Sequence, residues 1–309
     1  MKYLLTYFKG LAMGAADVVP GVSGGTIAFI TGILDTLLNS IRRINPSLWQ
    51  VVRHQGFKAA FLHINGPFLL SLFAGILTSI LTLAKLISYL LAFHPIPVWS
   101  FFFGLILISV VHMLKQVSGF TWGRLVLFAL GVAVAYFITM LSPITLDATP
   151  MNILLGGAIA ICAMILPGIS GSFILLLLGL YLPVIAAVKS LDVGVLAIFA
   201  CGAIVGLLTF SHVLSALLRH FHDATLVFLT GLMLGTLGKI WPWKQVLTWR
   251  TNSSGHQVPL LEQNLSPWQY EQVIGHSSQW PLAIVCLLVG IGLVWGLEYW
   301  SEQRQPKQD

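Results

Sequence analysis

Two short stretches decide the fold of this chain: residues 20–26 read PGVSGGT, and residues 167–172 read PGISGS. Each stretch interrupts a long apolar region near its middle, and neither flanking half reaches the roughly 20 apolar residues that a membrane-spanning helix needs. We therefore expect each region, residues 11–41 and residues 153–188, to form a re-entrant helical hairpin. Such a hairpin enters and leaves the membrane on the same face.

The two stretches belong to an internal duplication of the sequence. They align at an offset of 147 residues, which also places Gly32 on Gly179. A second register, offset by 127 residues, continues the similarity and pairs Gly75 with Gly202, Phe101 with Phe228, Gly104 with Gly231 and Lys85 with His212. We therefore predict two repeats, residues 1–148 and residues 149–309.

Each repeat also contains three apolar stretches that are candidate membrane spans. They are residues 66–91, 98–114 and 125–141 in the first repeat, and residues 196–218, 226–239 and 281–297 in the second. Because three is an odd number, the second repeat begins on the opposite side of the membrane from the first, and the repeats are inverted. The fold class that we predict is an all-α polytopic membrane protein, with residues 240–280 forming a long external loop.

The composition agrees with a membrane protein. Hydrophobic residues make up 57% of the chain and charged residues 8%, whereas charged residues make up about 25% of an ordinary soluble domain. Cytoplasmic loops of membrane proteins carry an excess of Lys and Arg. With the N-terminus inside, eleven of the sixteen Lys and Arg residues lie on the cytoplasmic side. Both termini are therefore predicted to be cytoplasmic.

Several kinds of binding site are not indicated by the sequence. The net charge is +6, but the longest basic run is the pair Arg42 and Arg43, so no nucleic-acid-binding surface is predicted. The three cysteines, Cys162, Cys201 and Cys286, are far apart and each lies in an apolar run. That spacing is not the spacing of a disulfide framework or a metal site. We predict no metal and no cofactor.

Inverted repeats with discontinuous helices are typical of secondary transporters, whose substrate site lies where the broken helices meet. Here that site would suit an anion, because glycines expose peptide N–H groups, hydroxyls add donors, and a helix N-terminus follows. The residues expected to contact a phosphate group are Gly21, Ser23, Gly24, Gly25 and Thr26 in the first stretch and Ser170, Gly171 and Ser172 in the second. The alternative is that both stretches are tight turns whose glycines serve packing.

Ionisable residues inside membrane segments are functional candidates by default. Lys85 would supply counter-charge to the phosphate, although its side chain could instead snorkel to the membrane surface. His212, its counterpart in the second repeat, could titrate or be a hydrogen-bonded core residue. Asp17 could carry a coupling proton or cap a neighbouring backbone segment. Lys239 lies at the end of its stretch, where a solvated or snorkelling side chain is expected.

The run MGAADVVPGVSGGT, residues 13–26, together with LPGISGS, residues 166–172, resembles the bacterial polyprenyl-phosphate transporter family. The likeness covers essentially the whole chain; the first motif is specific, and the second alone would be weak. The resemblance implies a flippase that moves undecaprenyl phosphate, a lipid carrier, from the outer to the inner leaflet of the bacterial cytoplasmic membrane for reuse in cell-envelope synthesis. It implies polyprenyl-phosphate and membrane lipids as partners and leaves a homo-oligomer open.

Other classes of protein remain as alternatives. A secondary transporter of a small anion and a lipid-binding regulator are both compatible with the sequence. An enzyme like undecaprenyl-diphosphate phosphatase is disfavoured, because Gly24 and Gly171 stand where the Arg of its similar Pro-Gly-x-Ser-Arg-Ser motif would be. The glutamates, Glu262, Glu271, Glu298 and Glu302, all lie outside the expected membrane core. We therefore predict no catalytic residues.

Overall fold

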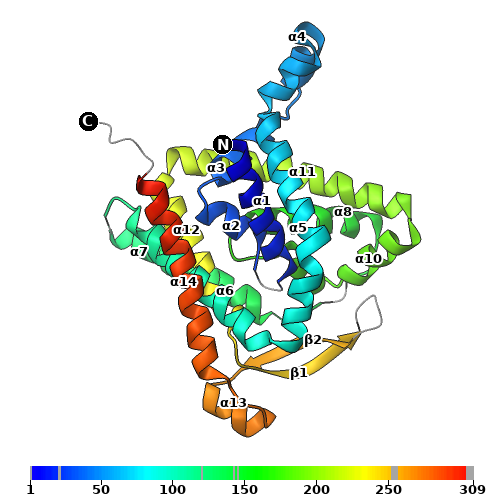
Figure 1. Cartoon of the computed structure of the whole chain (residues 1–309). Helices are drawn as coiled ribbons and strands as arrows, with labels where there is room; N and C mark the ends of the chain where they lie inside the picture. Colours follow the sequence, from blue (N-terminus) through cyan, green and yellow to red (C-terminus); the bar gives the residue numbers. More distant parts are fainter. Residues whose placement is uncertain are drawn as a thin grey trace.

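The computed structural model describes residues 2–19, 22–119, 121–141, 143–144, 146–251 and 257–303. This part of the chain is almost entirely helical, with one short β-hairpin (Figure 1). In chain order the elements are α1 (Lys2–Val18), α2 (Gly24–Ile30), α3 (Leu34–Arg42), α4 (Ser47–His63), α5 (Gly66–Phe93), α6 (Pro95–Lys115), α7 (Trp122–Met140), α8 (Pro150–Ile165), α9 (Gly171–Leu177), α10 (Tyr181–Ser190), α11 (Val193–His220), α12 (His222–Gly235), the 3-10 helix η1 (Leu237–Ile240), β1 (Lys244–Thr251), β2 (Gln257–Asn264), α13 (Pro267–Ile274) and α14 (Trp280–Gln303).

Among the described residues, five helices are long and apolar enough to cross a membrane: α5, α6, α7, α11 and the continuous segment of α12 and η1. They contain five of the six predicted spans, except that α7 ends at Met140, one residue before the predicted end at 141. The sixth predicted span lies within α14, which is a shorter apolar helix over Trp280–Gly296. Helices α5 and α11 have 28 residues each, which at 1.5 Å per residue makes them about 42 Å long. The prediction of a helical, multi-pass membrane protein is therefore confirmed.

The two broken regions are more broken than the sequence suggested. Each was expected to be a helix-turn-helix hairpin with one break, but each consists of three helices with two breaks. The additional break bends α2 against α3 by 112° and α9 against α10 by 111°. It occurs at Gly32 and Gly179, whose φ angles of 68° and 71° lie in the left-handed region that favours glycine.

Close contacts at glycines repeat between the two halves. A Cβ atom on Gly75 would collide with the carbonyl oxygen of Tyr7, and one on Gly202 would collide with the carbonyl oxygen of Leu154. Gly75 and Gly202 pair in one register of the duplication, and Tyr7 and Leu154 pair in the other. These matched contacts support the duplication, while the opposite orientation of the two repeats in a membrane stays a prediction.

The last helices of the two predicted repeats are exchanged. Helix α6 of the first repeat packs on α14 of the second, and α12 of the second packs on α7 of the first. A glycine lies at each contact: Gly104 meets the backbone of Leu287, and Gly231 meets the backbone of Phe128. Each predicted repeat therefore supplies part of the other's packing surface, and the main core cluster includes residues from both halves of the chain.

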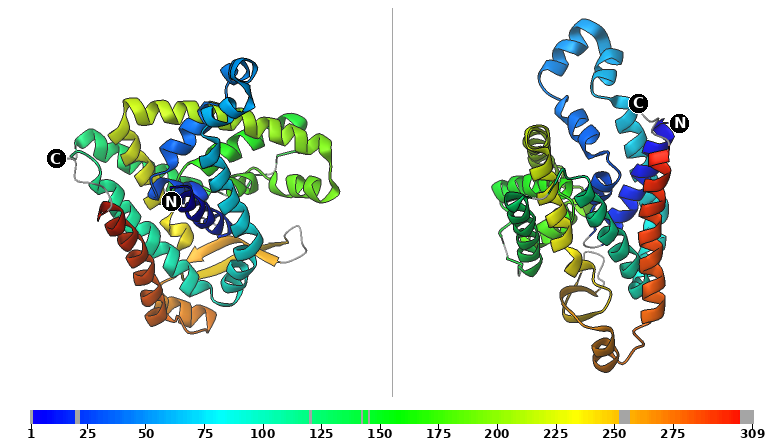
Figure 2. Two further views of the ribbon diagram at one scale, coloured as in Figure 1. Left: turned by 45° about the horizontal axis from the view of Figure 1, so that its top comes forward. Right: turned by 90° about the vertical axis from the view of Figure 1, so that its left-hand side faces the viewer.

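Two features of the fold were not predicted from the sequence. Helix α4 projects away from the helical bundle, as Figures 1 and 2 show. Strands β1 and β2 form an antiparallel hairpin, and with α13 they occupy the segment expected to be a long loop, residues 240–280. The hairpin is anchored by Trp243, whose indole N–H donates to the Ser278 carbonyl oxygen at 2.8 Å.

Candidate functional site

The two glycine-rich stretches meet in the structure, and we call them the first tip (residues 22–26) and the second tip (residues 168–172). The Ser23 hydroxyl donates to the Met164 carbonyl oxygen just before the second tip, at 3.0 Å. The Gly168 N–H donates to Thr26 Oγ1 at 2.8 Å. Ser23 and Thr26 are buried. The sequence prediction that the two broken regions come together therefore agrees with the contacts made by these residues.

The donors of the first tip are occupied by the protein itself. Ser23 caps α2 by accepting the Gly25 N–H at 3.1 Å, and Asp17 accepts the Gly24 N–H at 2.6 Å. Of the two roles considered for Asp17, backbone capping is the one its geometry displays, and proton coupling stays a prediction. In this conformation the first tip is bonded to the second and is not open to a ligand. Gly21 lies outside the described residues.

Glycine is required at both tips for close approach. A Cβ atom on Gly24 would lie 2.6 Å from Asp17 Oδ2, and one on Gly171 would lie 2.6 Å from the Ala160 carbonyl oxygen. Gly168 has a φ of 90°, and its Cβ would lie 2.7 Å from Thr236 Oγ1. In this closed arrangement of the tips, the glycines serve close packing, as the alternative interpretation of the two stretches predicted.

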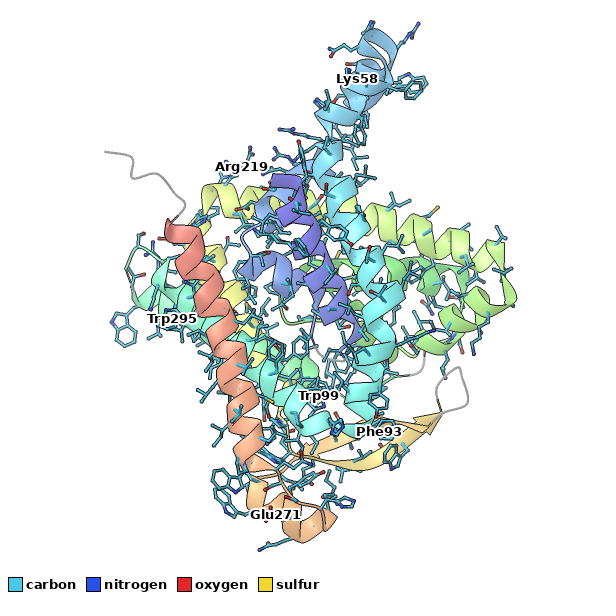
Figure 3. The ribbon with its side chains drawn as sticks, in the orientation of Figure 1. Lys58, Phe93, Trp99, Arg219, Glu271 and Trp295 are labelled. Atoms are coloured by element: carbon cyan, nitrogen blue, oxygen red, sulfur yellow. The ribbon has the colours of Figure 1, made fainter. Side chains whose placement is uncertain are left out.

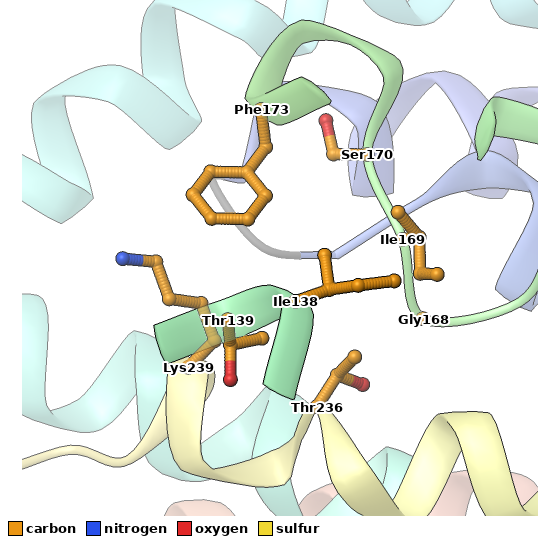
Figure 4. A pocket seen from close by; sticks show the side chains of 8 residues that line it. All are labelled: Ile138, Thr139, Gly168, Ile169, Ser170, Phe173, Thr236 and Lys239. Carbon is orange, nitrogen blue, oxygen red and sulfur yellow. The ribbon is translucent and has the colours of Figure 1, made fainter. Parts of the chain in front are cut away.

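The second tip borders a small pocket. Its hydroxyl-bearing residues Ser170 and Ser172 lie side by side, with 2.9 Å between their Oγ atoms. The pocket is lined by Gly168, Ile169, Ser170 and Phe173 of the second tip and α9, Ile138 and Thr139 of α7, and Thr236 and Lys239 beyond α12. Figure 4 shows Phe173 and Ser170 on one side of the gap, facing Lys239, Thr139 and Ile138 on the other. The cavity volume is about 10 Å³, close to the minimum for one water molecule.

Lys239 is the cation at this pocket, and the sequence interpretation of a solvated or snorkelling side chain missed it. Its Nζ lies 5.3 Å from the centre of the Phe173 ring, within the range of a cation–π contact. Its Nζ also lies 3.5 Å from Glu262 Oε2 on β2. These contacts join residues of η1, α9 and β2, which are far apart in the sequence. No sequence motif predicts them.

The structure does not bring Lys85 or His212 to the tips. Lys85 is exposed on α5, beyond Ser79, the last buried residue of that helix. His212 is exposed on α11, and its Nδ1 lies 2.7 Å from the Leu208 carbonyl oxygen. Neither is among the residues that line the pocket. Their proposed roles in counter-charge and titration therefore stay predictions.

Comparison with known proteins decides the family. A family model described as undecaprenyl phosphate translocase-like matches residues 13–258. The chain belongs to this family. A polyprenyl-phosphate transporter of Vibrio cholerae serotype O1 is 64% identical over 303 residues, which are 98% of each chain. A polyprenyl-phosphate transporter of Staphylococcus aureus is 31% identical over 261 residues, covering 77% of this chain and 86% of that protein. No solved structure gives a significant match.

Membership of the undecaprenyl phosphate translocase-like family confirms the resemblance found in the motifs. The match begins at Met13, the first residue of the specific motif, and it includes both tips and the Lys239 pocket. The similarity to the Vibrio cholerae protein extends the relationship through almost all of α13 and α14 as well. The part of the translocase-like chain that carries the candidate site is therefore within the region that defines the family.

Proposed function

We propose that this protein translocates a polyprenyl phosphate, with undecaprenyl phosphate as its cargo, across the bacterial cytoplasmic membrane. The observation that carries the proposal is the 64% identity, over 98% of both chains, with a protein named polyprenyl-phosphate transporter. The relatives are named as transporters, and the proposal contains no catalytic step. Outer-to-inner movement, which would return the carrier for reuse in cell-envelope synthesis, is part of the proposal.

The surface next to the pocket suits the apolar tail of such a lipid. The surface of α7 beside the pocket is apolar and is formed by Ala133, Val134, Tyr136, Phe137 and Ile138. Ile138 belongs both to this surface and to the lining of the pocket. A pocket with a cation beside an apolar helix surface matches an amphiphile, because the phosphate head needs hydrogen-bond donors and a cation while the prenyl tail can stay in contact with lipid.

Passage of the headgroup requires the tips to separate. A cavity of about 10 Å³ is too small for a phosphate group, so the structure corresponds to a closed state. We propose that separation breaks the Ser23–Met164 and Thr26–Gly168 hydrogen bonds. Separation would free the hydroxyls of Ser23 and Thr26 from the second tip. The N–H groups of Gly24 and Gly25 would have to exchange their bonds to Asp17 and Ser23 for bonds to phosphate. The other residues proposed to bind phosphate are Gly21, Ser170, Gly171 and Ser172.

The proposed orientation places both termini in the cytoplasm. Lys58 and Arg219, from the basic set predicted to be cytoplasmic, lie toward one end of the molecule, and Glu271 lies at the opposite end (Figure 3). The β-hairpin and α13 lie with Glu271 at that end (Figures 1 and 3). Lys239, which lies 3.5 Å from Glu262 of the hairpin, would then be on the external side, where cargo from the outer leaflet would arrive.

The experiment that tests the proposal compares cargo classes. The purified protein is reconstituted in liposomes and supplied either with labelled undecaprenyl phosphate or with labelled inorganic phosphate. We expect the protein to accelerate leaflet exchange of the lipid and not the uptake of the free anion. Uptake of inorganic phosphate without lipid exchange would contradict the proposal and favour the small-anion alternative.

A further inference from the structure

Three charged side chains meet between η1 and the β-hairpin. Lys239 Nζ and Lys244 Nζ lie 3.5 Å and 3.4 Å from the same carboxylate oxygen, Oε2 of Glu262. Lys244 also donates to the Lys239 carbonyl oxygen at 2.6 Å, and its Nζ lies 4.3 Å from the centre of the Trp99 ring. Two ammonium groups therefore share one carboxylate, and the cluster carries one positive charge in excess.

This excess charge is largely withdrawn from solvent. The side chains of Lys239, Glu262 and Lys244 are 25%, 19% and 8% exposed. Removing a charge from water is unfavourable unless an opposite charge compensates it. Burial, with a contribution from the neighbouring Lys239, lowers the pKa of Lys244 to about 8, although Glu262 opposes that shift. Among the described residues, one positive charge of the cluster is thus uncompensated.

The cluster borders the pocket at the second tip through Lys239. Ser170 lines the same pocket, and its Oγ lies 2.9 Å from Ser172 Oγ. The hydroxyls of Thr139 and Thr236, which also line it, donate to backbone carbonyl oxygens three residues earlier in the chain. An ammonium group beside a pair of serines is a suitable environment for phosphate oxygens, because charge-assisted hydrogen bonds are about twice as strong as neutral ones. The uncompensated positive charge therefore lies next to hydroxyls that can bind a phosphate monoester.

We propose that Lys239 is the primary phosphate-binding residue. The Glu262 carboxylate pairs with the Lys239 ammonium group until the cargo phosphate displaces it. The inference rests on the proposed function for the identity of the cargo, but the phosphate site itself is argued from the charge cluster and the pocket. Because Glu262 is on β2, its displacement from Lys239 removes one of the contacts that hold the hairpin to η1. Phosphate binding is thereby coupled to loosening of the contact between the hairpin and η1.

The test is equilibrium binding to the full-length protein in detergent. Farnesyl monophosphate serves as the phosphate-bearing probe, and farnesol serves as the matched probe without phosphate. We expect Lys239→Gln to weaken farnesyl monophosphate binding about tenfold or more, as for loss of a hydrogen bond to a charged group, and to leave farnesol binding unchanged. Lys239→Arg should retain most of the affinity. Lys189→Gln, at an exposed lysine of α10, is the charge-matched control and should bind like the wild type.

Glu262→Gln separates competition from a structural role. If Glu262 competes with phosphate, this variant should bind farnesyl monophosphate several-fold more tightly. Equal binding by Lys239→Gln and Lys189→Gln, or weaker binding by Glu262→Gln, would overturn the inference. If inorganic phosphate binds as tightly as farnesyl monophosphate and loses affinity in Lys239→Gln, the phosphate site stands and the lipid cargo of the proposed function fails.

Discussion

The N–H of Gly168 donates a hydrogen bond to Oγ1 of Thr26 at 2.8 Å, joining two broken helices that are 142 residues apart in the sequence. Both residues are buried, so this bond lies in the interior, where the two broken helices meet. Together with the Ser23–Met164 bond it closes the tips against each other. If the tips separate as proposed, the strength of these bonds contributes to the free energy required for opening.

Thr26→Val tests the contribution of this contact. Valine has nearly the same shape as threonine but no acceptor, so the buried Gly168 N–H would be left without its partner. We expect the protein to be destabilised by about 1–3 kcal/mol, measured as a lower thermal unfolding midpoint in detergent. Thr82→Val is the control, because Thr82 is exposed and bonds only within α5. An equal effect of both substitutions would contradict the role assigned to Thr26.

The duplication predicts equal sensitivity at matched glycines. Gly75→Ala and Gly202→Ala each place a methyl group against a backbone carbonyl of the neighbouring helix, and overpacking of this kind costs about 1–3 kcal/mol. We expect both variants to unfold at lower temperature and by similar amounts. Gly292→Ala in α14 meets no atom within 4 Å and should be neutral or slightly stabilising, because alanine favours helix. A harmless Gly202→Ala beside a damaging Gly75→Ala would contradict the matched packing.

Phosphate binding should weaken as the pH rises above about 8. Lys244, which faces Glu262, Lys239 and the Trp99 ring, has its pKa lowered by burial to about 8 from an ordinary value of 10.5. Above pH 8 the free protein loses this proton, and a bound anion would favour regaining it, so binding takes up a proton. The probe contributes no change in this range, because the second pKa of a phosphate monoester is about 6.

Lys244→Arg provides the matched variant for this pH dependence. An arginine stays charged throughout the range, so the decline in farnesyl monophosphate affinity between pH 8 and pH 10 should flatten. Calorimetric titrations at a series of pH values measure the effect. A decline of the same steepness in the wild type and in Lys244→Arg would show that another group is responsible.

The orientation predicts opposite labelling of α4 and α13. In a variant without the native cysteines Cys162, Cys201 and Cys286, a single cysteine at Lys58 should react with an impermeant thiol reagent only after the cytoplasmic face is exposed. A single cysteine at Gln272 should react from the outside of intact cells. Labelling of both positions from the same side would refute the inverted arrangement and the position of the external segment.

The sequence was sufficient for the features that have local signatures. The long apolar runs predicted α5, α6, α7, α11 and α12, because a membrane span is recorded in consecutive residues. The two PGxSG stretches predicted the breaks before α2 and α9. The additional breaks at Gly32 and Gly179 were visible as an aligned glycine pair, but a glycine alone does not distinguish a left-handed turn from close packing.

The candidate site depended on contacts that the sequence does not record. Lys239, Ser170 and Glu262 come from three separate elements, and their approach follows from the helix exchange and the position of the β-hairpin. Lys85 was a candidate because its charged side chain lies within a predicted span. In the structure it is exposed on α5, beyond the last buried residue of that helix. Ser23 and Thr26 of the first tip were predicted to contact phosphate. Their hydrogen bonds to residues at the second tip could not be predicted, because they join residues that are far apart in the sequence.

The most direct measurement of the central claim is leaflet exchange of labelled undecaprenyl phosphate in liposomes with and without the wild-type protein, with Ser170→Ala/Ser172→Ala and the control Ser190→Ala alongside. We expect the wild type and Ser190→Ala to accelerate exchange equally and the double variant to be strongly impaired while remaining folded. The same rate of exchange in protein-free and wild-type liposomes would contradict the proposed translocation of polyprenyl phosphate.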